Sequence, residues 1–506
     1  MLPVSASSDF YEASGYSAWD ALRDPASSPL PDPLEGLTIK DEHLERVLRG
    51  QDLLVQDGAM GTQLQAHGLA QSGQIPDLAS ISDPDIVTLV HKKYLEAGAE
   101  MVTTNSFGAN EIKLAETASV DEVCAAAVAC AKASGARYVA GSIGPLGKLL
   151  EPYGEVPFER AYELFFQQAR ALAEASADVI AIETMTDLRE AKAALLAAKA
   201  ACNLPVFASM TYTEKGRTLF GTPPAVVAAT LSSLGASVVC VNCSLGPREL
   251  LPIVRELVAA SRCPVAVRPN AGMPRLKDGK TVYDVTPDEF AQVMEQMLDM
   301  GVNIMGGCCG TDPSFTEKLA ELAARKAAPV LRSYLPALRI CGAQGMAQAD
   351  FRAGDELEIA FAVDSDDEDV LDDVREGDAD SVVDEAMDLR GEADVVELNL
   401  APAGVTGEEE RELLEEVVAE LEETSPMPLS LRTDDPETLE ALVRAIAGKP
   451  LVGTAQGGAA ALEQLLPVAK RYGCAIAISE AGDAAQHAAE RAMELGIPGE
   501  DIVFRG

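Results

Sequence analysis

Residues 178–200, DVIAIETMTDLREAKAALLAAKA, contain the pattern that decides the fold. An apolar run of β type ends on Glu183 and Thr184, and a helical stretch rich in Ala and Leu follows it. Strands that are apolar along their whole length belong to parallel sheets, because crossover helices cover both faces of such a sheet. This segment therefore predicts one βα unit of an α/β protein.

Units of this kind occur eight times in all. The apolar runs are LLVQD (53–57), EMVTTN (100–105), YVAGSIG (138–144), DVIAIET (178–184), PVFASMT (205–211), SVVCVNC (237–243), PVAVRPN (264–270) and VNIMGGC (302–308). Eight consecutive βα units predict a closed (β/α)8 TIM barrel, which we expect over residues 41–328. An open doubly wound sheet is the alternative, but no GxGxxG follows the first run and the sequence has no P-loop.

Length and charge limit the remaining possibilities. A chain of 506 residues exceeds the roughly 250–300 residues of a single core, so a second domain is expected. With 81 acidic and 40 basic residues the net charge is −41, which disfavours nucleic acid and anionic membranes as partners. The sequence has no apolar run of about 20 residues and no signal-like start, so we expect a cytoplasmic protein whose cysteines are reduced.

The two ends of the chain differ from the barrel. Residues 1–40 are rich in Ser, Pro and Asp without periodicity, which predicts a disordered extension outside the fold. Residues 329–506 are strongly acidic and contain about six further βα runs, too few for a barrel, so they predict an incomplete α/β barrel-like domain. These runs are LEIAFAV (357–363), ADVVELNL (393–400), MPLSLRT (427–433), KPLVGTA (449–455), CAIAIS (474–479) and DIVFRG (501–506).

Three cysteines stand at strand ends of the predicted barrel. Cys243 ends the sixth run, and Cys308 and Cys309 end the eighth. The carboxyl ends of barrel strands share one rim, so the three thiols should lie together. Three soft ligands with an open fourth position are typical of a catalytic zinc site. Adjacent cysteines can also be small packing residues in a Gly-rich turn, but the placement of all three at one rim favours the metal.

Seven motifs occur in one order along the first domain. They are DGAMGTQLQAHGL (57–69), YLEAGAEMVTTNSFGAN (94–110), GSIGPLG (141–147), IETMTDLREA (182–191), VNCSLGP (241–247), RPNAG (268–272) and GGCCGT (306–311). On these motifs the sequence resembles the zinc-dependent homocysteine S-methyltransferase family, in particular the homocysteine-binding module of cobalamin-dependent methionine synthase. The resemblance implies zinc held by Cys243, Cys308 and Cys309, with the homocysteine sulfur in the open position. It also implies that Asn270 caps the metal before substrate arrives.

The resemblance implies substrate-binding residues as well. Asp57 and Glu183 match the acids that bind the ammonium of homocysteine. Gly58 and Thr104 match positions that hold the substrate through backbone and hydroxyl groups. Ser80 departs from the family, which often has Asn at that position.

Residues 329–506 resemble the pterin-binding barrel that follows the homocysteine module in that enzyme, with clear departures. The family's Asp-Asn-Asp pattern has become Glu397, Asn399 and Ala401. CGAQG (341–345) lacks the Glu-Arg of the first pterin strand, and GTA (453–455) stands where an Asn is expected. The loss of these polar groups should weaken the binding of a pterin. We therefore predict a degenerate domain without folate.

The sequence thus predicts zinc-dependent methyl transfer to homocysteine, with methionine as the product. It contains no DxHxxG stretch, so we expect methylcobalamin to be supplied in trans by a separate corrinoid protein. Betaine or S-methylmethionine is the alternative methyl donor. A non-catalytic partner of a corrinoid protein is a less favoured interpretation, because all three cysteines are present.

Overall fold

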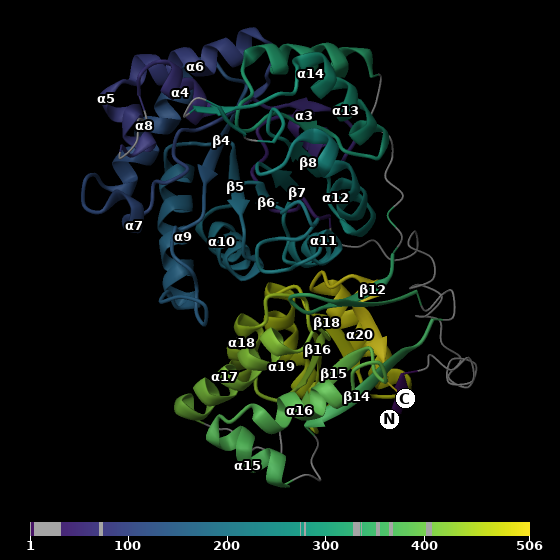
Figure 1. Cartoon of the computed structure of the whole chain (residues 1–506). Coiled ribbons are helices and arrows are strands. Elements are labelled where there is room, and N and C mark those ends of the chain that lie inside the picture. Colours follow the sequence, from purple (N-terminus) through teal and green to yellow (C-terminus); the bar gives the residue numbers. More distant parts are fainter. Residues whose placement is uncertain are drawn as a thin grey trace. The chain divides into compact units, whose positions relative to one another are not determined.

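A computed structural model gives the fold in two compact units, Gly36–Tyr334 and residues 335–506 with the first residues of the chain (Figure 1). The corresponding boundaries predicted from the sequence are 41–328 and 329–506. The structure describes residues 2–4, 32–69, 74–273, 275–277, 280–326, 334, 336–350, 355–363, 368–400 and 407–505. In that part of the chain, no helix is long and apolar enough to cross a bilayer.

The first unit is a parallel eight-stranded barrel in the order β2-β11-β8-β7-β6-β5-β4-β3. Its strands are β2 (Leu54–Val55), β3 (Met101–Thr103), β4 (Tyr138–Ile143), β5 (Val179–Met185), β6 (Val206–Met210), β7 (Val238–Asn242), β8 (Val265–Arg268) and β11 (Ile304–Met305). A parallel bridge between Gln56 and Met101 joins β2 to β3. The TIM barrel predicted from the eight apolar runs is confirmed.

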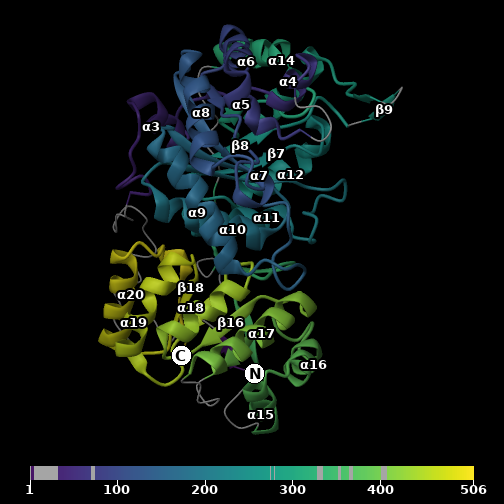
Figure 2. The same cartoon turned by 90° about the vertical axis from the view of Figure 1, so that its left-hand side faces the viewer.

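Helices surround the barrel strands (Figure 2). They are α3 (Glu42–Leu48), α4 (Met60–Ala66), α5 (Ala79–Ser82), α6 (Pro84–Glu96), α7 (Glu111–Leu114), α8 (Val120–Ala133), α9 (Phe158–Glu174), α10 (Leu188–Ala201), α11 (Pro224–Ser233), α12 (Pro247–Ala260), α13 (Pro287–Asp299) and α14 (Pro313–Arg325), with a 3-10 turn η1 (Pro76–Leu78). The local sequence determines where several of these helices begin. Ser119 with Glu122, and Thr286 with Glu289, form capping boxes at α8 and α13. A short hairpin, β9 (Arg275–Lys277) and β10 (Lys280–Val282), follows β8.

The second unit is built on a seven-stranded sheet in the order β1-β14-β15-β16-β17-β18-β19. Its strands are β1 (Leu2–Val4), β14 (Leu357–Val363), β15 (Val395–Asn399), β16 (Leu429–Arg432), β17 (Leu451–Gly453), β18 (Ala475–Ile478) and β19 (Ile502–Phe504). Its helices are α15 (Glu368–Glu376), α16 (Asp380–Asp388), α17 (Glu408–Thr424), α18 (Pro436–Ala445), α19 (Gly458–Arg471) and α20 (Gly482–Glu494), with a 3-10 turn η3 (Gly499–Asp501). β14 to β19 are parallel, so the predicted incomplete α/β barrel is confirmed.

The structure differs from the expected disordered extension at residues 2–4. These residues form β1, which pairs antiparallel with β14 through Leu2–Ile359, Pro3–Glu358 and Val4–Leu357. Backbone pairing along a sheet edge needs no side-chain pattern, and three residues are too few to show one. Residues 5–31 lie outside the described residues, and 32–40 lead into the barrel, with Thr38 N donating to Asn203 O at 2.7 Å.

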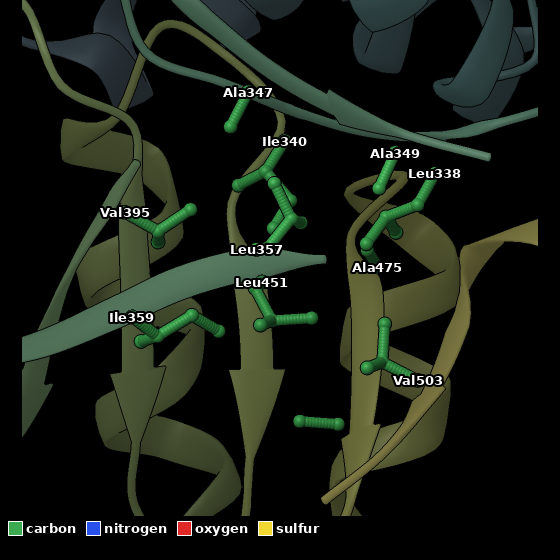
Figure 3. Packing of buried hydrophobic residues seen from close by; sticks show 11 residues of the cluster. Leu338, Ile340, Ala347, Ala349, Leu357, Ile359, Val395, Leu451, Ala475 and Val503 are labelled. Carbon is green, nitrogen blue, oxygen red and sulfur yellow. The ribbon is translucent and has the colours of Figure 1, made fainter. Parts of the chain in front are cut away.

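A hairpin covers part of the second sheet. β12 (Leu338–Cys341) and β13 (Met346–Ala349) pair antiparallel, and Cys341 exchanges two backbone hydrogen bonds of 2.8 Å with Lys449, just before β17. Figure 3 shows hairpin residues such as Ile340 beside strand residues such as Leu451, within one buried cluster. Residues 342–345 are thus the turn of a hairpin rather than the end of a parallel strand. Their comparison with a first pterin strand was therefore wrong.

A buried ion pair joins two strands of this unit. Lys449 Nζ lies 2.5 Å from Asp501 Oδ1, and the two side chains are 1% and 2% exposed. Lys449 precedes β17 and Asp501 precedes β19, so the pair links the amino ends of strands that flank β18. Removal of one partner leaves the other charge buried, which costs more than replacement of both.

We predict that Lys449→Met lowers the free energy of unfolding of the second unit by about 3–5 kcal/mol, because Asp501 loses its buried cation. Hydrogen exchange of the full chain in urea should show earlier loss of protection in β17–β19, with the barrel unchanged. Lys449→Met/Asp501→Leu is the matched control and should recover most of the loss. Equal losses in the single and double variants would contradict the argument.

Candidate functional site

Three loops at the carboxyl ends of barrel strands are tied together by backbone hydrogen bonds. Cys243 N donates to Arg268 O at 3.1 Å, Cys308 N to Pro269 O at 2.8 Å, and Ala271 N to Cys309 O at 3.0 Å. The loop after β8 thus holds the loops after β7 and β11 on either side. This is the mouth of the barrel, where barrel enzymes place their chemistry.

The three predicted thiols meet at this mouth. The sulfur atoms of Cys243, Cys308 and Cys309 lie within 4.8 Å of one another, and Cys243 Sγ is 3.7 Å from Cys309 Sγ. The contact with Cys243, together with burial, raises the pKa of the Cys308 thiol to about 12. A divalent cation would supply the positive charge that thiolates need here. Three sulfur donors fit a soft or borderline metal such as zinc.

Cys243 also has an unusual backbone conformation. Its φ is 62° and that of Ser244 is 59°, both in the left-handed region that non-glycine residues rarely adopt. Thr184 shares this feature with a φ of 64°. Strain of this kind clusters at functional sites. The side chain of Asn242 joins the carboxyl ends of β7 and β5, because its Nδ2 donates to Thr184 Oγ1 at 2.8 Å and its Oδ1 accepts from Thr184 N at 2.8 Å.

Asn270 offers a further oxygen. Asn270 is 2% exposed, and its Oδ1 has no hydrogen-bond partner among the residues that the structure describes. A buried amide oxygen without a partner is costly, so it marks a place for a ligand or an ion. This observation fits the predicted role of Asn270 as a metal cap.

The two predicted ammonium-binding acids both lie in the mouth. Asp57 is 1% exposed and accepts hydrogen bonds from Thr103 N at 2.8 Å and Thr103 Oγ1 at 2.9 Å. Burial raises the pKa of Asp57 to about 6, although Arg268 and Thr103 oppose the shift. Glu183 is 12% exposed at its side chain and accepts a hydrogen bond from Ser142 Oγ.

Arg268 lies between these acids and was missed by the sequence analysis. Its Nη1 is 2.9 Å from Glu183 Oε2, its Nη2 is 3.5 Å from Asp57 Oδ1, and its Nε donates to Gly307 O at 3.3 Å. Burial opposes the charge of this guanidinium, but Glu183 and Asp57 raise its pKa above the usual value. The signal was a lone charged residue within the apolar run PVAVRPN.

Gly58 and Thr104 have clear structural contacts. A Cβ on Gly58 would lie 2.5 Å from Thr311 Oγ1, so only glycine allows this close approach. Thr104 Oγ1 accepts from Ser142 N at 2.9 Å and lies 2.7 Å from Ser106 Oγ, which links β3 to β4. Ser80 is buried, and its Oγ accepts from Asn105 Nδ2 at 3.2 Å. The substrate contacts of Gly58 and Thr104 stay predictions.

The polar strand ends of the second unit are bonded to one another. Glu397 is fully buried; it accepts hydrogen bonds from Ser430 Oγ at 2.8 Å and from Arg505, and Arg432 Nη1 lies 3.7 Å from it. Arg432 also donates to the carbonyl oxygens of 454 and 455 at 3.0 and 3.1 Å. Asn399 Oδ1 is buried and has no partner among the described residues, and Ala401 lies outside them.

Comparisons with known proteins agree with the barrel. The family model described as homocysteine S-methyltransferase matches residues 54–323. The methionine synthase of Mycobacterium tuberculosis is 32% identical over 329 residues, which cover 60% of this chain and 28% of that protein. The methionine synthase of Mycobacterium leprae is 33% identical over 297 residues, which cover 54% of this chain and 24% of that protein. The chain thus spans less than a third of the length of these relatives.

Solved structures similar to this chain include a homocysteine methyltransferase from Escherichia coli. Its oxidized form is 24% identical, with a TM-score of 0.48, and the match covers 56% of this chain and 99% of that one. Its metallated form is also 24% identical, with a TM-score of 0.47, and the match covers 58% and 100%. This likeness concerns the fold alone.

Proposed function

Since the chain belongs to the homocysteine S-methyltransferase family, we propose that it transfers a methyl group to the thiol of homocysteine and forms methionine. The observation that carries this proposal is the group of three thiols, Cys243, Cys308 and Cys309, at the mouth of the barrel. Two acids and the open acceptor of Asn270 surround the same mouth, which supplies partners for a small amino acid.

The proposed metal is zinc, held by the three cysteine sulfurs, with Asn270 as a cap. A free thiol has a pKa near 8.5 and is mostly protonated at neutral pH. Zinc, when bound, would lower the pKa of the substrate thiol. Three cysteine thiolates give the site a net negative charge, so the substrate sulfur keeps electron density for attack. Asn242 and the backbone of the loop after β8 hold these cysteines in place.

We predict one zinc ion per chain and its loss in Cys309→Ala, because two thiols and an amide are a poor tetrahedral set. Elemental analysis of both proteins measures this. Cys202→Ala, which removes a half-buried thiol after α10, is the control and should keep full metal. Full zinc and full activity in Cys309→Ala would rule out the ligand assignment.

The proposed roles of Asp57 and Glu183 are to bind the ammonium of homocysteine. The fit is electrostatic, because Asp57 is buried, the side chain of Glu183 is 12% exposed, and both carboxylates lie in the same mouth as the thiols. Each retains oxygen lone pairs beyond the hydrogen bonds described above. The substrate would then be anchored at two ends, by its sulfur and by its ammonium.

We expect Asp57→Asn and Glu183→Gln each to weaken homocysteine binding by about 1.5–3 kcal/mol, because a charge-assisted contact is lost while zinc remains. Calorimetric titration of the zinc-loaded protein measures the change. Asp178→Asn is a matched control, since Asp178 stands just before β5 at the opposite end of the strand that carries Glu183. Unchanged affinity in both site variants would reject these roles.

The proposed methyl donor is a methylcorrinoid, free or carried by a separate protein. Exposed apolar side chains around the mouth support a large donor. Five such side chains are 36–64% exposed: Phe107, Leu149, Tyr153 and Leu219 on the loops after β3, β4 and β6, and Val282 at the end of β10 in the hairpin after β8. Exposed apolar groups gathered around a functional mouth are typical of a docking surface.

The second unit is proposed not to bind folate. Glu397, at the position of the first family acid, is already bonded to Ser430 and Arg505. A pterin that bonded Glu397 Oε2 would have to displace these buried contacts, which would leave charged groups without partners.

We predict methionine formation from homocysteine with methylcobalamin, but not with betaine or S-methylmethionine, and no binding of methyltetrahydrofolate by the full chain. Side-by-side turnover with the three donors and a folate titration measure this. Cys309→Ala serves as the inactive control. Turnover with betaine or S-methylmethionine alone would overturn the donor assignment, and micromolar folate binding would overturn the proposal for the second unit.

A further inference from the structure

Arg268 occupies the space between the two acids that the proposed function assigns to the substrate ammonium. It reaches Glu183 through Nη1 at 2.9 Å and Asp57 through Nη2 at 3.5 Å. Its side chain is 9% exposed, and Nε is anchored on Gly307 O at 3.3 Å. The guanidinium is therefore a fixed part of the mouth.

This arrangement reduces the preference of the two acids for a substrate that carries an ammonium. Two carboxylates and one guanidinium carry one net negative charge instead of two. One oxygen of each carboxylate is engaged by Arg268, so an incoming ammonium meets a weaker field and fewer open acceptors. The loss in affinity for a thiol that lacks the ammonium is therefore smaller than it would be beside two unpaired acids.

We propose that Arg268 is a specificity-determining residue that weakens the selection for an α-ammonium on the acceptor thiol. The site then also accepts thiols that carry a carboxylate without an ammonium. This inference rests on the proposed transfer to homocysteine. The opposite role, in which Arg268 orients the acids for the ammonium, makes a prediction of opposite sign.

The test compares two thiols that differ only in the ammonium, homocysteine and 4-sulfanylbutanoate. Calorimetry on the zinc-loaded full chain gives the ratio of their dissociation constants, in which the shared contact between sulfur and metal cancels. We expect Arg268→Met to raise the preference for homocysteine about tenfold over wild type, because a charge-assisted contact becomes available. Arg268→Gln, which keeps a donor toward Glu183, should shift the ratio in the same direction and serves if the Met variant fails to fold.

Arg160→Met is the matched control. Arg160 also bridges two acids, Glu111 at 2.6 Å and Glu163 at 3.0 Å, but it lies on the exposed surface of α9. Its loss changes the net charge equally and should leave the ratio unchanged. An unchanged or lower ratio in the Arg268 variants overturns the inference and leaves the proposed function intact. Failure of both thiols to bind the wild-type protein overturns the proposed function and the inference together.

Discussion

The pairing of β2 with β11 is the constraint on which the site depends. It aligns Leu54 with Ile304 and Met305 with Val55, and so places residues 57 and 306–309 side by side although about 250 positions separate them. Gly307 N donates to Asp57 O at 3.0 Å, and a Cβ on Gly306 would lie 2.9 Å from the same oxygen. Gly306 thus permits a backbone approach that a larger residue would prevent. An acid of the first strand and two thiols of the last therefore share one rim.

Buried charge at this rim is balanced locally. Asp57 and Glu183 would each be costly to bury alone, and Arg268 offsets part of that cost through contacts with both. The three thiols contact one another and are largely removed from solvent, and these contacts together with burial raise their pKa values. The negative charge of the two acids is thus partly balanced by Arg268, whereas three thiolates would need a further cation. This is the condition expected of a site that takes up a divalent metal.

The barrel and its cysteines were predictable, whereas the charge pairing was not. Continuous apolar runs predicted all eight barrel strands, because a strand covered on both faces needs apolar side chains throughout. Strand ends then placed Cys243, Cys308 and Cys309 together by topology alone. Arg268 was missed, because the partner of a lone charge depends on strand order rather than on sequence distance. β1 was missed because a three-residue edge strand leaves no periodic signal.

Both units place polar residues at the carboxyl ends of parallel strands, but the two sets differ in what they leave open. In the second unit, Glu397 Oε2 bonds Ser430 and Arg505, and Arg432 donates to backbone carbonyls, whereas Glu397 Oε1 and Asn399 Oδ1 have no hydrogen-bond partner among the described residues. In the barrel, the oxygen of Asn270 likewise has no hydrogen-bond partner among the described residues, and the sulfur atoms of three cysteines lie within 4.8 Å of one another. Ligands bind where polar groups are pre-positioned and unpaired. The barrel mouth therefore differs from the second unit in its cluster of three sulfur donors, which suits a soft or borderline metal.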